Sequence, residues 1–586
     1  MSIMLHGIGV ARGIAIGKSY LMEHGQPDIA EYKVPEYLVE SEIERYKSAL
    51  EGTRSQLVAL RGEVPAGVPG EVTDFIDAHL LMLEDNAISR APIKNIRRQH
   101  CNAEWALKQQ RDTLVQAFEE MEDPYLRTRK DDIDHVINRI MTLLLQQEND
   151  TQELLEPDED QVSRIIIASN LTAADILQLK QQNIAGIITE HGAPNSHSAI
   201  LARSLHIPTV MGAGNSHRYL HDGEPVIING TSGMILIDSD EKVITHYLAL
   251  QQQEQEHKAS LNKLRSQAAV TRDSVAVSLQ ANVELEEEIT AMQEAGCRDI
   301  GLYRTEFLFL NRDTLPSEEE QYQNYRSVLE QIGDGATLTI RTLDIGTDKP
   351  IPAIAEMESA ENPVLGIRAI RLSLKNLELL LPQIRAILRA SAHGKIRMMI
   401  PMVTSLQEVA QVQNHIEQEK RKLTNREIPF DPDLPIGAMI ETPAAAFAAD
   451  GFAQQLDFLS IGTNDLSQYT LAIDRTDDQV NYLFNPLHPA FLRVIHHIIQ
   501  TAARFNTPVS LCGELAGDDR YTRLLLGMGL REFSMGPSML PEVKQAVLNT
   551  RLDFIEPLVE QMLATPFPDE IKQLFDEINR FRSDHG

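Results

Sequence analysis

The chain has 586 residues, and its 54 lysines and arginines against 85 aspartates and glutamates give a net charge of −31 at neutral pH. That negative charge repels phosphate backbones and anionic lipids, which argues against nucleic acid or membrane partners and favours a partner protein with a basic patch. Its three cysteines show no paired spacing, and neither a signal-peptide layout nor a membrane-spanning apolar run is present. We therefore expect a cytoplasmic protein of about three or four domains.

Two kinds of sequence pattern, one typical of strands and one typical of helices, follow each other in the amino-terminal part of the chain. Residues 1–35 contain the run GIGVARGIAIG, whose alternation of apolar residues and glycines predicts short strands. Over residues 36–147 apolar residues recur at helical spacing, as in Val39, Ile43 and Tyr46, which predicts an all-helical block. The pattern allows two interpretations of this block, a bundle that packs only on itself or a docking surface.

Strand patterns return over residues 148–240. The runs RIIIAS, AGIITE, PTVMG, PVIING and GMILID predict strands, and TAADILQLK predicts a helix among them. We expect this segment and residues 1–35 to form one small α/β domain into which the helical block is inserted. Residues 241–270 are polar, rich in glutamine and free of glycine and proline, which predicts a stiff connecting helix.

Residues 271–586 alternate short β-branched runs with helical runs. Eight strands are predicted, namely VAVSLQANV, DIGLYRTEFL, LTIRTLDIG, IRMMIPMV, PIGAMIE, FLSIGTND, PVSLCGEL and EFSMGP. Eight strands separated by helices are typical of a (β/α)8 barrel. The expected fold class is therefore a multidomain α/β protein with an α/β domain, an inserted helical bundle, a linker helix and a carboxyl-terminal barrel.

The active site of such a barrel lies at the carboxyl ends of its strands. Most of the predicted strands end on polar or charged residues, which are Asn282, Arg304 with Glu306, Arg341 with Asp344, Glu441, Asn464 with Asp465, and Cys512 with Glu514. A strand that simply leaves the core gives the same pattern at one position. The repetition around the barrel favours an active site.

The cations of this region stand out in an acidic chain. They are Arg304, Arg341, Lys349, Arg368 and Arg475. Guanidinium groups suit carboxylate and phosphate oxygens, so their convergence indicates a small, highly anionic substrate. Glu441 and Asp465 would then be natural ligands of one magnesium ion, which takes one or two carboxylates plus substrate oxygens. A structural network of salt bridges is the alternative interpretation.

A second candidate site lies in the run TEHGAPNSHSAILARS. Gly192, Pro194 and Asn195 predict a turn, and a helix is expected to begin beside His197. Backbone amides at a helix start favour phosphate, so His197 is a candidate phosphoryl acceptor. An ordinary surface histidine is the alternative, since the chain has 18 histidines. Ser196 is a weaker candidate nucleophile because the G-x-S-x-G motif is missing.

These motifs together are recognisable. The runs GIGVARGIAIG, GAPNSHSAILARSLHIPTVMG, GLYRTEFLFLNRD, RTLDIGTDKP, ENPVLGIRAIR, IPMVTS, IETPAAA, SIGTNDLSQYTLAIDR and LCGELAGD resemble Enzyme I of the bacterial phosphotransferase system, the phosphoenolpyruvate–protein phosphotransferases. The resemblance covers nearly the whole chain in the family's order.

The resemblance implies phosphorylation of His197 by phosphoenolpyruvate, release of pyruvate and transfer of the phosphate to HPr, a small carrier protein docked on residues 36–147. This would begin a pathway of sugar uptake or a regulatory relay. It also implies that the barrel, residues 271–586, forms a homodimer and that Cys512 donates a proton. The implied substrate residues are Arg304, Arg341, Lys349, Arg368, Asn464 and Arg475, and the implied magnesium ligands are Glu441 and Asp465.

Three observations compare this chain with rival interpretations and with the family pattern. Pyruvate phosphate dikinase and phosphoenolpyruvate synthase share the histidine domain and the barrel, but only about 35 residues precede the helical block, which carries no Gly-rich loop for ATP. A non-catalytic scaffold is disfavoured because His197, Glu441, Asp465 and Cys512 are all retained. His191 and Ala193 depart from the small residue and the second glycine expected ahead of the histidine.

Overall fold

The computed structural model describes most of the chain. The described residues are 3–22, 29, 31–63, 70–119, 124–146, 163–171, 173–182, 184–192, 196–205, 207–214, 216–286, 288–309, 312, 314–346, 362, 364–474, 480 and 483–580. Two compact units make up the chain, Met1–Glu256 and His257–Gly586. Among the helices within these ranges, none combines the length and apolar character that crossing a membrane requires.

An eight-stranded sheet organises the α/β part of the first unit, in the order β1-β8-β7-β3-β4-β5-β6-β2. Its strands are β1 Ile3–His6, β2 Ile8–Ala11, β3 Ile14–Met22, β4 Arg164–Ala168, β5 Gly186–Thr189, β6 Thr209–Met211, β7 Pro225–Asn229 and β8 Met234–Ile237. The four strands from β3 to β6 pair in parallel, and the other pairs are antiparallel. The continuous apolar runs of β4 and β5 are buried, as central parallel strands usually are.

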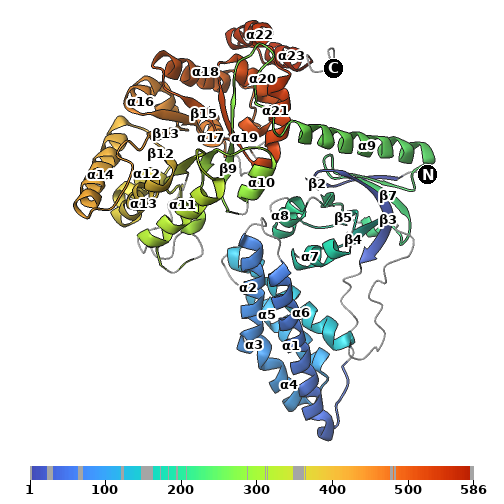
Figure 1. The fold of residues 1–586 in the computed structure, drawn as a ribbon. Coiled ribbons are helices and arrows are strands. Elements are labelled where there is room, and N and C mark those ends of the chain that lie inside the picture. Colours follow the sequence, from blue (N-terminus) through green and yellow to red (C-terminus); the bar gives the residue numbers. More distant parts are fainter. Residues whose placement is uncertain are drawn as a thin grey trace. The chain divides into compact units, whose positions relative to one another are not determined.

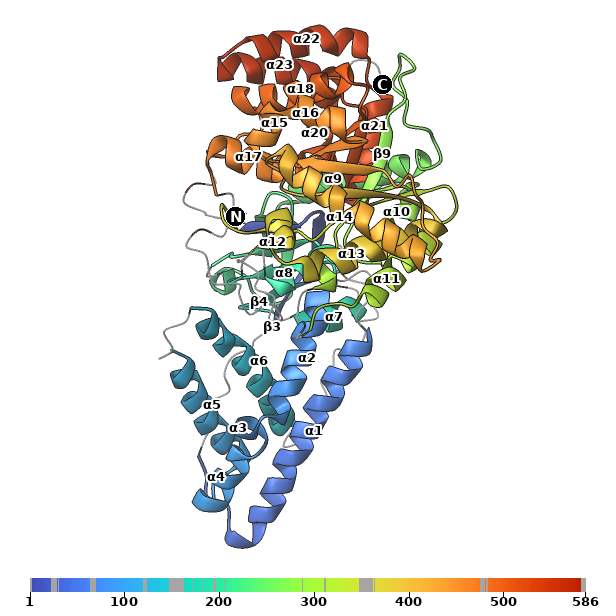
Figure 2. The same ribbon diagram turned by 90° about the vertical axis from the view of Figure 1, so that its left-hand side faces the viewer.

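Helices cover this sheet and form a block beside it. They are α1 Val39–Glu63, α2 Gly70–Glu84, α3 Asn86–Ser89, α4 Ala91–Gln99, α5 Ala103–Glu119, α6 Pro124–Gln146, α7 Ala173–Gln181 and α8 His197–Ser204. Helix α6 packs against both α1 and α5, and these helices run side by side in two views (Figures 1 and 2). Ile43 of α1 and Leu201 of α8 belong to one buried cluster, so the helical block and the α/β part share a core.

The connecting helix, α9 Glu241–Lys263, is shorter than the sequence pattern suggested. We expected helix through residue 270, but the chain turns after Lys263, where Leu264 N–H donates to Leu261 O at 2.9 Å and Gln267 N–H donates to Leu264 O at 3.0 Å. These turns direct the chain toward the first barrel strand. The division into domains with assigned roles stays a prediction.

The second unit contains a closed barrel of eight parallel strands in the order β10-β11-β12-β13-β14-β15-β16-β9. They are β9 Ser278–Val283, β10 Ile300–Tyr303, β11 Thr337–Arg341, β12 Lys395–Ile400, β13 Ile436–Ile440, β14 Phe458–Ile461, β15 Val509–Leu511 and β16 Glu532–Met535. Each strand falls within one of the eight predicted runs or within a residue of it. The expected fold class is confirmed.

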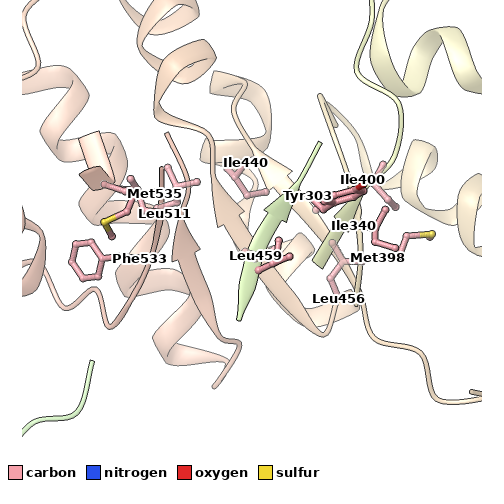
Figure 3. Close-up of a cluster of buried hydrophobic side chains, with 14 of the residues drawn as sticks. Tyr303, Ile340, Met398, Ile400, Ile440, Leu456, Leu459, Leu511, Phe533 and Met535 are labelled. Carbon is pink, nitrogen blue, oxygen red and sulfur yellow. The ribbon is translucent and has the colours of Figure 1, made fainter. Parts of the chain in front are cut away.

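Alternate residues of each strand serve two cores. Ile340, Met398 and Ile400 lie in the cluster between strands and helices, part of which is drawn in Figure 3. Met399 and Met439 belong to a second, smaller cluster that also contains Cys512. Because Met399 lies between two residues of the outer layer, this smaller cluster occupies the barrel interior.

Helices surround the ring of strands (Figure 1). They are α10 Glu288–Glu294, α11 Glu318–Ile332, α12 Ala369–Lys375, α13 Leu377–Ala390, α14 Leu406–Asn425, α15 Pro443–Phe447, α16 Ala449–Gln455, α17 Thr463–Leu471, α18 Pro489–Arg504, α19 Glu514–Gly517, α20 Asp519–Gly527, α21 Leu540–Leu548, α22 Leu552–Ala564 and α23 Pro568–Arg580. Local signals fix several boundaries; α14, for example, begins with a capping box between Ser405 and Glu408. This packing holds the strand ends, and therefore the site, in place.

Candidate active site

Arg341 is the last residue of β11 and the centre of a buried charge cluster. Its Nη2 lies 2.9 Å from Glu306 Oε1 and its Nη1 lies 2.9 Å from Asp344 Oδ2, while the side chain is only 11% exposed. Burial alone would lower the pKa of Arg341, but the negative charges of Glu306 and Asp344 outweigh it and raise that pKa. The guanidinium is therefore a permanent cation at the carboxyl end of the barrel.

Asp344 joins two arginines. Its Oδ1 lies 3.2 Å from Arg368 Nη2, and its other oxygen contacts Arg341. Burial opposes ionisation of this carboxyl, yet the positive charges of Arg341 and Arg368 hold its pKa below the ordinary value. Glu306 completes the cluster by accepting the Asp344 backbone N–H at 3.0 Å. The two acids thus fix the orientation of both guanidinium groups.

The arginines keep donor groups unused. The Nε atoms of Arg304, Arg341 and Arg368 are buried and have no hydrogen-bond partner among the described residues. An unsatisfied buried donor costs about 1–3 kcal/mol, so three of them at the carboxyl end of the barrel indicate a missing acceptor. A substrate with several anionic oxygens would supply it. Arg304 also makes a looser contact, with its Nη1 3.3 Å from Glu284 Oε2.

Glu441 follows β13 and is 1% exposed. Its Oε1 accepts the Met402 backbone N–H at 2.6 Å, and a Cβ at Gly462 would lie 2.7 Å from its Oε2, so only glycine fits there. Burial raises the pKa of Glu441, and the negative charges of Asp344 and Asp465 raise it further, against the opposing effect of Arg341. The positive charge near Glu441 is therefore too small to offset burial and the neighbouring acids.

The side-chain charges at the carboxyl end of the barrel suit a binding site for a divalent cation. Among the described residues, three arginines (Arg304, Arg341 and Arg368) lie with five acids (Glu284, Glu306, Asp344, Glu441 and Asp465), so negative charge is in excess there and an added cation would favour an anionic substrate. No group of three histidines, cysteines or acids suited to a metal occurs in the described ranges. Two carboxylates completed by substrate oxygens are what magnesium accepts.

Cys512 follows β15 and is 3% exposed. Its Sγ lies 3.6 Å from Ile461 O, and burial raises the pKa of the thiol to about 11. The charges of Glu441, Arg341 and Arg304 all act on it, which places it at the same site. The thiol is therefore protonated at neutral pH and can act as an acid.

Two asparagines are fixed by their neighbours. Asn282 Nδ2 donates to Cys512 O at 2.9 Å, and its Oδ1 accepts from Ser534 Oγ at 2.6 Å. Asn464 accepts the Glu514 N–H at 3.0 Å and donates to that residue's Oε1 at 3.2 Å. Asn464 lies next to Asp465 in the first turn of α17, which follows β14, so both residues lie at the carboxyl end of the barrel.

The histidine loop lies in the other unit. Helix α8 begins at His197, and Ser196 caps it by accepting the Ala199 N–H at 3.2 Å. Ala193, Pro194 and Asn195 fall outside the described residues, as does the His197 side chain. The exposed His191 donates its backbone N–H to Ser169 O at 3.0 Å. Its bulky side chain is therefore accommodated at the surface.

Most of the predicted barrel residues converge. Electrostatic interactions link Arg304, Arg341, Arg368, Glu441, Asp465 and Cys512. Lys349 and Arg475 lie outside the described residues. The sequence interpretation gave no role to Glu306 and Asp344, which position the arginines. The signal available for Asp344 was an acid three residues after Arg341 on a strand end.

Comparison with known proteins agrees with this site. The profile of the PEP-binding domain of PEP-utilising enzymes matches residues 258–552, that of their N-terminal domain matches 6–129, and that of their mobile domain matches 161–233. Together with the arginine-lined barrel, these matches define a phosphoenolpyruvate-utilising enzyme.

Relatives that match nearly the whole chain show which kind of phosphoenolpyruvate-utilising enzyme it is. The phosphoenolpyruvate-protein phosphotransferase of Cupriavidus necator is 42% identical over 97% of this chain and 98% of its own length, and that of Listeria monocytogenes is 38% identical over 98% and 99%. An Enzyme I structure determined by NMR is 29% identical over 43% of this chain and 99% of its own, with a TM-score of 0.35. The chain belongs to the phosphoenolpyruvate–protein phosphotransferase family, Enzyme I, and is a phosphotransferase.

Proposed function

We propose that this chain transfers the phosphoryl group of phosphoenolpyruvate to His197 and then to a histidine of an HPr-like carrier protein. The observation that carries this proposal is the arginine cluster with three buried Nε–H donors that have no partner among the described residues, since it suits a substrate with a carboxylate and a phosphate. The start of α8 supports the acceptor role, because the backbone amides and the dipole of a helix start favour a phosphoryl group beside His197.

Substrate binding would rest on the barrel. Arg304, Arg341 and Arg368 would bind the carboxylate and phosphate oxygens, with Asn464, Lys349 and Arg475 completing the set expected from the family. Because Asp344 and Glu306 already orient two guanidinium groups, little reorganisation is needed when the substrate arrives.

Glu441 and Asp465 would hold a magnesium ion. The excess of acids over arginines around Glu441 supports this assignment. The metal would offset negative charge on the substrate oxygens during phosphoryl transfer. The Met402 N–H fixes one Glu441 oxygen, which leaves the other oxygen as the proposed metal ligand.

Cys512 would complete the reaction. A ring nitrogen of His197 forms a bond to phosphorus as the bond between phosphorus and the enol oxygen breaks, which leaves the enolate of pyruvate. The methylene carbon then takes the proton of the Cys512 thiol, giving pyruvate and a thiolate that solvent reprotonates. The raised pKa of Cys512, caused by burial, supports this role because the proton is present at neutral pH.

The carrier and the cellular setting are further parts of the proposal. The helical block, residues 36–147, would dock the carrier, and the barrel would form a homodimer, as the family resemblance implies. The net charge of −31 favours a partner with a basic docking face and disfavours nucleic acid and membranes. The reaction would take place in the cytoplasm and begin sugar uptake or a regulatory relay.

The test uses labelled phosphoenolpyruvate, magnesium and a purified HPr-like carrier. Wild-type protein should label itself and the carrier without any nucleotide, and His197→Ala should do neither. His191→Ala is the matched control, since that exposed histidine lies six positions earlier in the same loop and should be labelled normally. Carrier labelling by His197→Ala, or a requirement for ATP, would contradict the proposal.

A further inference from the structure

A second polar cavity lies at the opposite end of the barrel from the arginine cluster. It has two adjoining compartments of about 1170 and 240 Å³, which share Gln267, Gly296 and Cys297 in their walls. The inner one is lined by Ser278, the first residue of β9, and by Asp299, which precedes β10. Residues that precede the strands lie at the amino-terminal face, so roughly 20 Å of strand separates this cavity from the candidate active site.

Lys544 of α21 lines the inner compartment and is 8% exposed. Its Nζ donates to Arg265 O at 2.9 Å and makes no ion pair with any residue the structure describes. An ammonium group has three N–H donors, so donors remain for another partner. Burial lowers the pKa of Lys544, which reflects the cost of holding an ammonium group without a counter-charge.

The outer compartment adds three more cations. Lys263, Arg265 and Arg298 line it, and none of the described residues in its wall is acidic. The one acid of the inner compartment, Asp299, already accepts the Thr337 N–H at 2.8 Å. Within the described part of the chain, four cations and one acid therefore line this cavity, whereas the net charge of the whole chain is −31. The local sign is opposite to that of the whole protein.

We propose that this cavity binds a small polyanion, a phosphate ester or a polycarboxylate, between Lys544 and Arg298. The anion neutralises the buried ammonium group and accepts its remaining N–H donors, while Arg298 reaches it from the outer compartment. The site is independent of the phosphoenolpyruvate site, because the two lie at opposite ends of the strands.

Binding there has a local consequence at α9. The last residue of that helix, Lys263, and residues 265–269 of the following turn form part of the cavity wall. A bound anion would tie this turn to α21 and to the segment before β10. Hydrogen exchange of amides over residues 262–269 and 293–299 should therefore slow when the site is filled.

The experiment titrates the full-length protein with inorganic phosphate and, separately, with citrate by calorimetry at low ionic strength. Wild type should show two classes of sites for at least one probe. Arg298→Gln should weaken one class about ten-fold, and Arg341→Gln should weaken the other. Lys572→Gln, which removes an exposed charge from α23, is the control and should change neither class. The probe whose binding depends on Arg298 identifies the ligand class.

Lys544→Met is the second variant. If the Lys544→Met protein does not fold, Arg298→Gln still tests the proposal, because the Arg298 side chain is exposed. Loss of the Arg298-dependent class and of the slowed exchange in Lys544→Met supports the proposal. Two results overturn it. One is binding of both probes that is unchanged in Arg298→Gln. The other is a Lys544→Met protein that is less stable but binds normally, which would assign the lysine only to the turn after α9.

Discussion

The two proposed phosphate-handling regions are built differently. At the carboxyl end of the barrel, side-chain charges are buried and paired, as in Arg341, which is 11% exposed, and Asp344, which is 5% exposed. At the start of α8 the structure offers a helix terminus and neutral hydroxyls, with Ser196 as the cap and Ser198 Oγ 3.0 Å from its hydroxyl. One region relies on full charges and the other on dipoles.

The difference suits the two tasks. Phosphoenolpyruvate carries several permanent charges, so binding it requires counter-charges that are already in place. A phosphoryl group on His197 must leave again for a carrier, and weaker neutral donors would hold it without trapping it. The contrast predicts that removing a charge in the barrel site lowers activity strongly, whereas changing the Ser196 cap of α8 lowers it only slightly.

Removing the central cation should have the largest effect. Arg341→Met leaves Glu306 and Asp344 buried without their partner and takes a substrate contact away. We expect kcat/KM for phosphoenolpyruvate to fall about 1,000-fold, since losing one partner of a desolvated charged contact to a ligand costs about 2–5 kcal/mol of binding free energy. Steady-state kinetics with a saturating carrier would measure the loss.

A variant matched to Arg341→Met distinguishes a loss of folding stability from a loss of substrate binding. Arg385 is also partly buried and pairs with Glu318 and Glu419 on the helices around the barrel. Arg385→Met should lower thermal stability to a similar degree yet leave kcat/KM within about two-fold of wild type at a temperature where it is folded. Equal losses of activity in both variants would show that Arg341 serves only the fold.

The next effect concerns Glu441, whose pKa is raised by burial and by neighbouring acids. Glu441→Gln should lower activity about 100-fold, because a proposed metal ligand is lost, while making the metal-free protein more stable. A raised native pKa means that wild-type stability falls as pH rises from the ordinary glutamate value through the native one. The stability gained by the variant should therefore grow with pH over that window.

Thermal unfolding of both proteins in chelator, between pH 4 and 8, would measure this. The Gln carbonyl oxygen can still accept the Met402 N–H, so the local fold is retained. A variant that is less stable than wild type across the whole range would contradict the prediction.

A smaller effect is expected from the thiol of Cys512. Because burial raises its pKa to about 11, the thiolate fraction at pH 8 should be roughly 200-fold below that of an ordinary cysteine. Alkylation of Cys512, followed by peptide mass spectrometry, should accelerate ten-fold for each pH unit between pH 7 and 10. A plateau near pH 8.5 would indicate an unperturbed thiol and weaken the proposed acid role.

The smallest effect should come from the helix cap. Ser196→Ala removes the acceptor of the Ala199 N–H and should cost about 1 kcal/mol of stability, with phosphorylation of His197 slowed only a few-fold. Ser405→Ala, which removes the cap of α14 in the barrel, is the matched control and should leave that rate unchanged. A 100-fold loss in Ser196→Ala would mean that the hydroxyl takes part in the chemistry.

Much of the fold could be predicted because the signals are local. The eight β-branched runs of the barrel and the helical spacing of residues 36–147 depend on neighbours a few positions apart. The polar residues at strand ends were also predictable, since a barrel brings those ends to one face. The end of α9 was not, because nothing in the run after Lys263 breaks a helix. The turn there is stabilised by Lys544, which lies far away in the sequence.

By itself the sequence determined which elements form and which residues can carry chemistry, through side-chain periodicity and the types of residue at strand ends. Only the tertiary structure decided which charges meet. Closure of the barrel pairs β16 with β9. Packing sets Arg341 against Glu306 and Asp344, whereas Lys544 forms no ion pair with any residue that the structure describes. Sequence spacing carries no information about such lateral neighbours, because the partners come from different strands and helices whose order in space is set by folding.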